Sequence, residues 1–175
     1  MRHTISILVE NDFGVLARIS GMFSARGFNI ENLSVNETLD ASISRITLQT
    51  TGEDAVLAQI IKQLNKLVPV IQVSDMRDAP HVQRELALIK VRADATTRNE
   101  VMTIADIFRA KIVDVASETC VVEITGDDDK IGALIRLLDP IGIKEIARTG
   151  KTALFRGERL LTVSSDERTK KEQSA

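Results

Sequence analysis

The fold is decided by residues 43–67, whose sequence is ISRITLQTTGEDAVLAQIIKQLNKL. In the first part of this stretch polar and apolar residues alternate, which predicts a strand with one face toward a core and with Thr47 and Gln49 facing outward. From 53 to 67 apolar residues recur every three or four positions, the pattern of an amphipathic helix that Pro69 ends. A strand followed by such a helix indicates a sheet with helices packed on it.

The same two patterns continue on both sides of this stretch. The other strands expected in the first part of the chain are 4–9, 30–37 and 70–76. A further helix starts near Leu16, and Gly27 is its expected C-cap. Asp40 and its neighbours form the turn of a hairpin. The first part of the chain therefore has the order strand, helix, strand, strand, helix, strand.

The second half of the chain repeats this order. The expected elements are a strand at 86–91, a helix at 98–109, a hairpin of 112–116 and 121–125, a helix at 128–138 and a strand at 141–147. Placing Phe23 on Phe108 also places Asn29 on Asp114, an offset of 85 residues. Two such units of about 75 residues predict an α+β protein with two ferredoxin-like βαββαβ domains in tandem, each a four-stranded antiparallel sheet with two helices on one face.

Composition suggests where the domains begin and end. The first domain is expected at 1–77 and the second at 85–160, joined by a linker at 78–84. Residues 161–175 are predicted to be a flexible tail, because from Ser164 onward they contain one alanine as their only apolar residue.

Composition also excludes several classes of protein. Lys and Arg (23) nearly balance Asp and Glu (25), for a net charge of −2, which argues against a nucleic-acid-binding protein. The single cysteine, Cys120, permits no internal disulfide and fits a reducing compartment. The apolar run in residues 1–9 is too short for a signal peptide, and no apolar stretch approaches the roughly 18 residues of a membrane span. We therefore expect a cytoplasmic protein that binds neither nucleic acid nor membrane.

The two repeats differ where their first helix begins. In the second repeat Thr97 and Glu100 have the spacing of a capping box, in which side chains satisfy the free amides of a helix start. The first repeat has Asn-Asp-Phe-Gly at 11–14, without a Glu or Gln three residues after an evident cap. The N–H groups and the positive dipole end behind Gly14 would suit a carboxylate. The alternative is that Asn11 or the aspartate after it caps the helix and that Gly14 only turns the chain.

No constellation of catalytic residues is evident. The two histidines and Cys120 are too few for a metal cluster at ligand spacing, and a cysteine at the start of a predicted strand is typical of a core thiol. Gly-Lys-Thr at 150–152 resembles the end of a phosphate-binding loop, but the glycine needed five positions earlier is Glu145. The three aspartates at 127–129 suit the start of a helix better than a magnesium site. We expect no catalytic residue, metal site or cofactor in this chain.

The start of the chain carries a specific resemblance. Residues 5–18, ISILVENDFGVLAR, resemble the first strand, loop and helix of an ACT domain. The continuation at 21–33, GMFSARGFNIENL, is similar to the regulatory (small) subunits of acetolactate synthase, also called acetohydroxyacid synthase. Further matches are Ser44-Arg45, the helix at 59–68, HVQREL at 81–86 and ARTG at 147–150. The resemblance spans about residues 1–160, whereas a generic ACT match would cover only the first half.

This resemblance implies a function without catalysis. Subunits of the family bind a large subunit that carries thiamine diphosphate, FAD and Mg²⁺ and condenses 2-oxo acids in branched-chain amino-acid synthesis. They raise its activity and make it sensitive to feedback inhibition, usually by valine. By this resemblance the domain at 1–77 is the effector-binding ACT domain, and the second domain serves assembly or activation. The alternative is a free-standing amino-acid-sensing ACT protein that acts on another partner.

The resemblance also implies where the effector binds. In the family it sits between the ACT domains of two small subunits whose sheets lie side by side, so a homodimer through the ACT domains is expected. The positions that match this effector site are Asn11, Gly14, Val15, Leu16, Asn29 and Ile30. The first four would receive the carboxylate and the amine of the amino acid in one copy, and the last two would close the pocket from the partner copy.

Overall fold

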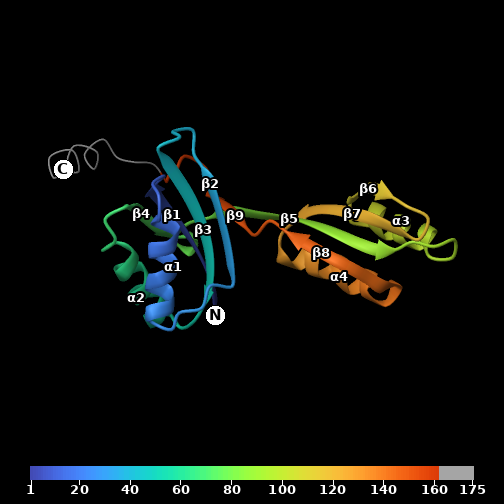
Figure 1. Cartoon of the computed structure of the whole chain (residues 1–175), viewed down its shortest axis with the longest axis horizontal. Coiled ribbons are helices and arrows are strands. Elements are labelled where there is room, and N and C mark those ends of the chain that lie inside the picture. The colour runs from blue at the N-terminus through green and yellow to red at the C-terminus, as the bar shows by residue number, and fades with distance from the viewer. Residues whose placement is uncertain (162–175) are drawn as a thin grey trace. The chain divides into compact units, whose positions relative to one another are not determined.

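A computed structural model describes residues 1–161, so residues 162–175, nearly all of the tail expected at 161–175, lie outside the described part. The chain forms two compact units. One consists of Met1–Val82 together with the residues from Thr152 onward, and the other of Gln83–Lys151. Each unit contains a sheet with helices packed on it (Figure 1).

The first unit has the expected βαββαβ order and confirms the predicted fold class for this half. Its elements are β1 (Arg2–Glu10), α1 (Val15–Ala25), β2 (Asn32–Glu37), β3 (Ile43–Thr51), α2 (Asp54–Leu64) and β4 (Val70–Asp75). The strands form an antiparallel sheet in the order β2-β3-β1-β4. This order leaves β2 and β4 as the two edges of the sheet.

The second unit repeats the order. Its elements are β5 (His81–Arg92), α3 (Arg98–Ile107), β6 (Lys111–Val115), β7 (Thr119–Gly126), α4 (Asp128–Gly142) and β8 (Ile143–Arg148). The sheet has the order β6-β7-β5-β8, and β9 (Thr152–Phe155) pairs with β5 outside this order. A short 3₁₀ helix (Met76–Asp78) precedes β5. The segment expected as a linker at 78–84 is therefore largely the first part of a long strand.

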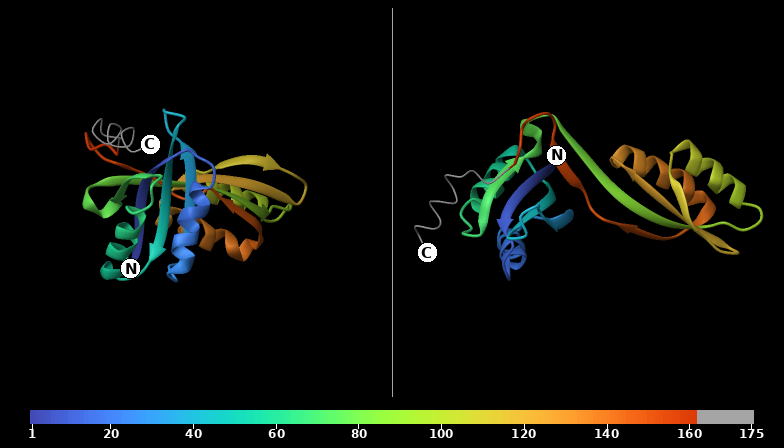
Figure 2. Two further views of the ribbon diagram at one scale, coloured as in Figure 1. Left: turned by 60° about the vertical axis from the view of Figure 1, so that its left-hand side comes forward. Right: turned by 90° about the horizontal axis from the view of Figure 1, so that it is seen from above.

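Each sheet buries one apolar face under its two helices (Figure 2). The fully buried side chains of the first core include Ile5, Ile7, Ile19, Phe23, Ile46, Leu48, Ile60 and Leu64. Burial of one such side chain contributes about 1.5–3 kcal/mol to stability. The apolar residues that alternate along β1 and β3 and those on one side of α1 and α2 therefore determine which faces pack together. Among residues 1–161 no helix combines the length and the apolar character needed to cross a membrane.

Residues 152–161 lie with the first unit, although the sequence suggested a second domain extending to 160. The backbone N–H of Arg156 donates to the carbonyl of Pro80 at 2.8 Å. The guanidinium of Arg45 donates to the carbonyl of Leu161 at 3.2 Å. These contacts join positions far apart in the sequence, and no local pattern in the sequence predicts them.

Thr47 and Gln49 lie on the helix-free face of the first sheet, but they are buried rather than exposed as expected. The side-chain amide of Gln49 donates to the hydroxyl of Thr4 at 3.1 Å, and Leu161 packs against Leu8 on the same face. Alternation in a strand predicts which face a residue takes. It does not predict that distant residues return to cover that face, so the prediction of exposure was wrong.

The first helix of each unit ends in the same way. Gly27 follows α1 with φ +67°, and Arg109 follows α3 with φ +52°. The amide of Phe28 donates to the carbonyl of Phe23 at 3.0 Å, and the amide of Ala110 donates to that of Ala105 at 2.8 Å. These are the long-range bonds of a Schellman cap, which confirms the C-cap expected at Gly27.

This shared cap corrects the alignment of the two repeats. Gly27 corresponds to Arg109, an offset of 82 residues rather than 85. Phe23 therefore corresponds to Ala105, and the match of the two phenylalanines was wrong by three residues. Since one of the two caps uses an arginine in the left-handed region, no glycine marked the equivalent position in the second repeat.

We expect Gly27→Ala to lower the free energy of unfolding by about 1 kcal/mol, because a Cβ disfavours the left-handed conformation that this cap requires. Denaturation by urea measures the change. The matched control is Gly21→Ala inside α1, where an added Cβ meets open space. This control should raise the free energy of unfolding by about 0.5–1 kcal/mol. Equal stability of Gly27→Ala and the wild type would contradict the assignment.

Candidate functional site

The start of α1 has no side-chain cap. Its N-cap residue is Gly14, which has φ +81°, and no side chain accepts a hydrogen bond from the first turn. The amide of Val15 makes one long bond, 3.4 Å, to the carbonyl of Asp12, and the first regular helical bond runs from Arg18 to Gly14. In the described part of the chain, the N–H groups of Leu16 and of the alanine after it have no acceptor. These amides and the helix dipole can hold a carboxylate.

Asn11 does not cap α1, because its side chain is engaged elsewhere. Its amide nitrogen donates to the carbonyl of Ala41 at 2.9 Å and to the carboxylate of Glu37 at 3.2 Å. Its amide oxygen accepts from the hydroxyl of Ser44 at 3.0 Å. The alternative that Asn11 or Asp12 caps the helix is therefore wrong. The amide oxygen of Asn11 keeps one lone pair, which can accept from an ammonium group.

Glu37 and Ser44, the residues that hold Asn11, were missed from the sequence alone. Both flank the hairpin turn around Asp40, and Ser44 also lies in the Ser44-Arg45 match to the family. The register between β1 and β3 brings these residues to Asn11. In this register Ser44 lies opposite Val9, near the end of β1. The sequence contains the residues but not this register.

Gly14 has room for a neighbouring group. A Cβ built on Gly14 meets no atom within 4 Å, so the glycine is required here by its φ angle and not by crowding. Val15 is buried in the core of the first unit, whereas Leu16 is 41% exposed. Backbone groups of this turn are therefore accessible while the helix behind them is fixed by packing.

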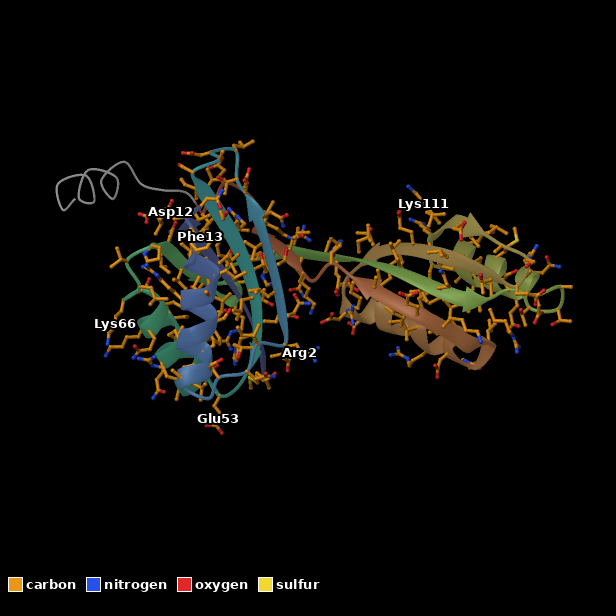
Figure 3. All side chains as sticks on the ribbon, viewed as in Figure 1. Arg2, Asp12, Phe13, Glu53, Lys66 and Lys111 are labelled. Carbon is orange, nitrogen blue, oxygen red and sulfur yellow. The ribbon has the colours of Figure 1, made fainter. Side chains whose placement is uncertain are left out.

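Asn29 and Ile30 lie at the other end of α1. They follow the Schellman cap, and the carbonyl of Asn29 accepts from the hydroxyl of Thr50 at 2.7 Å. The side chain of Asn29 is exposed, and Ile30 packs partly buried against the core. Because α1 has 11 residues, about 16 Å separates its ends. One chain therefore does not bring Gly14 and Asn29 together, and Figure 3 shows Asp12 and Phe13 at the end of the unit opposite Glu53.

The start of α3 does not have the expected capping box. The hydroxyl of Thr97 does not cap α3. Instead the carboxylate of Asp94 accepts from the backbone N–H and the hydroxyl of both Thr96 and Thr97, at 2.6–3.1 Å. These hydrogen bonds lower the pKa of Asp94 to about 2. The capping box expected in the second repeat is therefore wrong. As in α1, the N–H groups of the second and third residues of α3 have no acceptor in the described part of the chain. The two helix starts differ in that a carboxylate, that of Asp94, lies just before α3.

Other candidate residues serve structure. Lys151 is buried and pairs with Asp128, and Arg148 binds Glu85 through two hydrogen bonds of 2.9 and 2.5 Å. Cys120 lies in the core of the second unit, where burial raises the pKa of its thiol. Within residues 1–161 no three His, Cys, Asp or Glu side chains gather in a way that could hold a metal ion.

Two protein-family models match the chain, one to each unit. The model described as "AHAS small subunit-like ACT domain" matches residues 5–72, and the model described as "Small subunit of acetolactate synthase" matches residues 84–157. All six expected site positions lie within the first of these two matches.

Relatives of known name agree with these models. The chain is 52% identical over 156 residues to the acetolactate synthase small subunit of Aquifex aeolicus, which covers 89% of this chain and 81% of the relative. It is 50% identical over 159 residues to the probable acetolactate synthase small subunit of Archaeoglobus fulgidus, covering 91% and 99%. The crystal structure of the acetolactate synthase small subunit from Thermotoga maritima matches with a TM-score of 0.82 at 40% identity, covering 91% of this chain and 99% of that one.

The Asp94 cap predicts a specific pH dependence. Because the folded pKa of about 2 lies below the ordinary value near 3.9, the charged carboxylate stabilises the fold above about pH 5, and this contribution disappears as the pH falls toward 2. In Asp94→Asn the acceptor oxygen remains but does not titrate. The difference in unfolding free energy between wild type and Asp94→Asn should therefore shrink between about pH 4 and 2 in urea denaturation. A difference that stays constant over this range would contradict the role of the carboxylate.

Proposed function

Because this chain belongs to the family of acetolactate synthase small subunits, we propose that it binds and activates the catalytic large subunit and makes that enzyme sensitive to valine. The chain itself is a regulatory subunit. The structural observation that carries the proposal is the start of α1, where amides of the first turn remain without acceptors behind Gly14. Thiamine diphosphate, FAD and Mg²⁺ are then resident on the large subunit, and the assembly works in the cytoplasm.

The amino-acid effector is held at this helix start. Its carboxylate accepts from the amides of Gly14, Val15 and Leu16, where the helix dipole adds attraction. Of these three amides, that of Val15 makes only a long hydrogen bond to the carbonyl of Asp12, which the ligand replaces. The ammonium donates to the remaining lone pair on the amide oxygen of Asn11.

A second copy of the chain completes the pocket. Asn29 and Ile30 follow the far end of α1, and the length of this helix separates them from Gly14 by about 16 Å. They therefore close the pocket at Gly14 only when they come from a partner copy. The strand β2 is an edge of its sheet, and a second sheet can lie beside such an edge in a homodimer. This dimer places the effector between two ACT domains.

Selectivity among branched-chain effectors is modest in this pocket. Burial of the isopropyl group of valine contributes about 1.5–3 kcal/mol, and one methylene more or less changes binding by about 1–3 kcal/mol. Leucine and isoleucine therefore compete with valine, while an acidic side chain such as that of glutamate is rejected by the apolar surroundings of Leu16 and Ile30.

Regulation requires that valine binds two arrangements of the dimer with different affinity. A coupling free energy of about 1–3 kcal/mol changes the activity of the large subunit by 5- to 150-fold. Valine then favours the arrangement of the dimer that is the weaker activator of the large subunit.

We expect valine to raise the unfolding temperature of the purified chain, because a ligand at about 100 times its Kd stabilises the native state by about 2.7 kcal/mol. Leucine should give a smaller shift and glutamate none, as measured by thermal denaturation. In the presence of the large subunit, the chain should raise acetolactate formation, and valine should reverse this increase. A chain that neither raises this activity nor responds to valine would contradict the proposal.

Gly14→Asp should abolish the thermal shift with valine, because its carboxylate repels that of the ligand. The matched control is Gly14→Asn, which has the same size and tolerates φ +81° equally well but carries no charge. We expect Gly14→Asn to keep a measurable shift and Gly14→Asp to activate the large subunit without valine inhibition. A thermal shift with valine that persists in Gly14→Asp would contradict the site.

A further inference from the structure

One end of the first unit presents large apolar side chains to solvent. Phe13 in the loop between β1 and α1 is 103% exposed, and Leu39 at the tip of the β2–β3 hairpin is 110% exposed. Val68, in the loop before β4, is 77% exposed. Exposed apolar side chains that gather at one end of a unit are typical of a surface that another molecule covers.

Hydrogen bonds to the end of β1 hold these three loops at the same end of the unit. The amide of Glu10 donates to the carbonyl of Pro69 at 2.9 Å, next to Val68. The amide of Asn11 donates to the carbonyl of Ser42 at 2.7 Å, and the Asn11 side chain donates to Ala41 at 2.9 Å. Each exposed side chain is thus within two residues of a bond that joins its loop to the end of β1.

The hairpin tip that carries Leu39 is well ordered. The carboxylate of Asp40 accepts from the backbone N–H of Ser42 at 3.0 Å and from its hydroxyl at 2.6 Å, and the hydroxyl of Thr38 donates to the carbonyl of Asp40 at 3.0 Å. Leu39 is therefore presented on a fixed turn, which lowers the entropy lost when a partner covers it.

The loops that carry Phe13 and Leu39 are rich in acidic residues. Residues 10–14 and 37–42 contain four carboxylates, those of Glu10, Asp12, Glu37 and Asp40, and no Lys or Arg. The third loop, at 65–69, contributes one cation, Lys66. We call Phe13, Leu39 and Val68 with these four carboxylates the apical surface. Its complement is an apolar cleft with basic side chains at the rim.

We propose that the apical surface is the contact through which this chain grips the catalytic large subunit, in an apolar cleft of that subunit rimmed by basic side chains. This inference rests on the proposed function and names the part of the chain that carries it out. Charge decides against a second copy as the occupant, because two apical surfaces meeting around a two-fold axis would bring carboxylates against carboxylates. The second copy is instead placed along α1 and β2 by the effector pocket.

The position of Phe13 connects the contact with the effector. Phe13 directly precedes Gly14, so a carboxylate on the amides behind Gly14 fixes the loop that presents Phe13. The loop between β1 and α1 then both binds the amino acid and contacts the large subunit. By reciprocity, the large subunit changes the affinity for valine by the same factor as valine changes the affinity for the large subunit.

The test measures the concentration of this chain that gives half-maximal activation of the purified large subunit. Leu39→Ser and Phe13→Ser should each raise that concentration about tenfold, as loss of an anchor side chain at an interface does. Ile107→Ser, which removes a side chain of the second unit that is 70% exposed, should change it less than about twofold. All three variants should keep the unfolding temperature of the wild type, because the removed side chains are exposed.

Charge is tested with a second matched pair. Asp12→Lys should raise the half-maximal concentration and make it less sensitive to salt, because it removes attraction to the basic rim. Glu53→Lys makes the same change in charge at the opposite end of the unit (Figure 3) and should leave both quantities unchanged.

Different failures are distinguishable. If Leu39→Ser and Phe13→Ser activate at the same concentration as the wild type, the apical surface is not the contact, although the proposed function stands. If they instead shift the chain from dimer to monomer in light scattering, a second copy covers the surface and the inference is overturned. If the wild-type chain neither binds nor activates the large subunit, the proposed function itself fails.

Discussion

The candidate site depends on one local constraint, the start of α1 at a glycine in the left-handed conformation with no side chain on the amides behind it. A helix start without a cap is less stable by about 1 kcal/mol than one with a Ser or Asp cap. The chain maintains it because Val15 is anchored in the core and because Asn11, the nearest candidate cap, is held by the hairpin through Ala41 and Ser44. The site thus exists because the side chain of Asn11 bonds to the hairpin instead of capping α1. It does not depend on an added ligand-binding side chain.

The equivalent helix start in the second unit differs in its charge. There the carboxylate of Asp94 lies just before α3 and accepts from the amides of Thr96 and Thr97, so an external carboxylate would meet a negative charge. Both units keep the same sheet order, the same irregularity in the pairing of their first and last strands, and the same helix C-cap. The duplicated fold therefore has one helix start without a nearby carboxylate in its own turn and one preceded by Asp94, which fits a division between an effector domain and a domain that serves assembly.

Most of the fold was predictable, because it follows from local patterns. The alternation in β3 and the stripe of α2 predicted the sheet and its helical face, and Gly27 marked the end of α1. The offset between the repeats was wrong because Arg109 takes a conformation that glycine usually takes, so the sequence held no mark of it. The exposure of Thr47 was wrong because residues 152–161 return to the first unit. Each error came from a long-range contact or an unusual backbone angle.

For the site, the sequence by itself determined the chemistry. Asn-Asp-Phe-Gly at 11–14 before an apolar helix stripe was compatible with free amides or with a local cap. The similarity to a family that binds an amino acid at this position favoured free amides that hold a carboxylate. Only the tertiary structure decided that Asn11 is unavailable as a cap, that Asn29 lies at the far end of α1, and that Phe13 and Leu39 share one exposed end. The physical reason is that helix signals act within a few residues, whereas these placements depend on strand register, which joins positions about thirty residues apart.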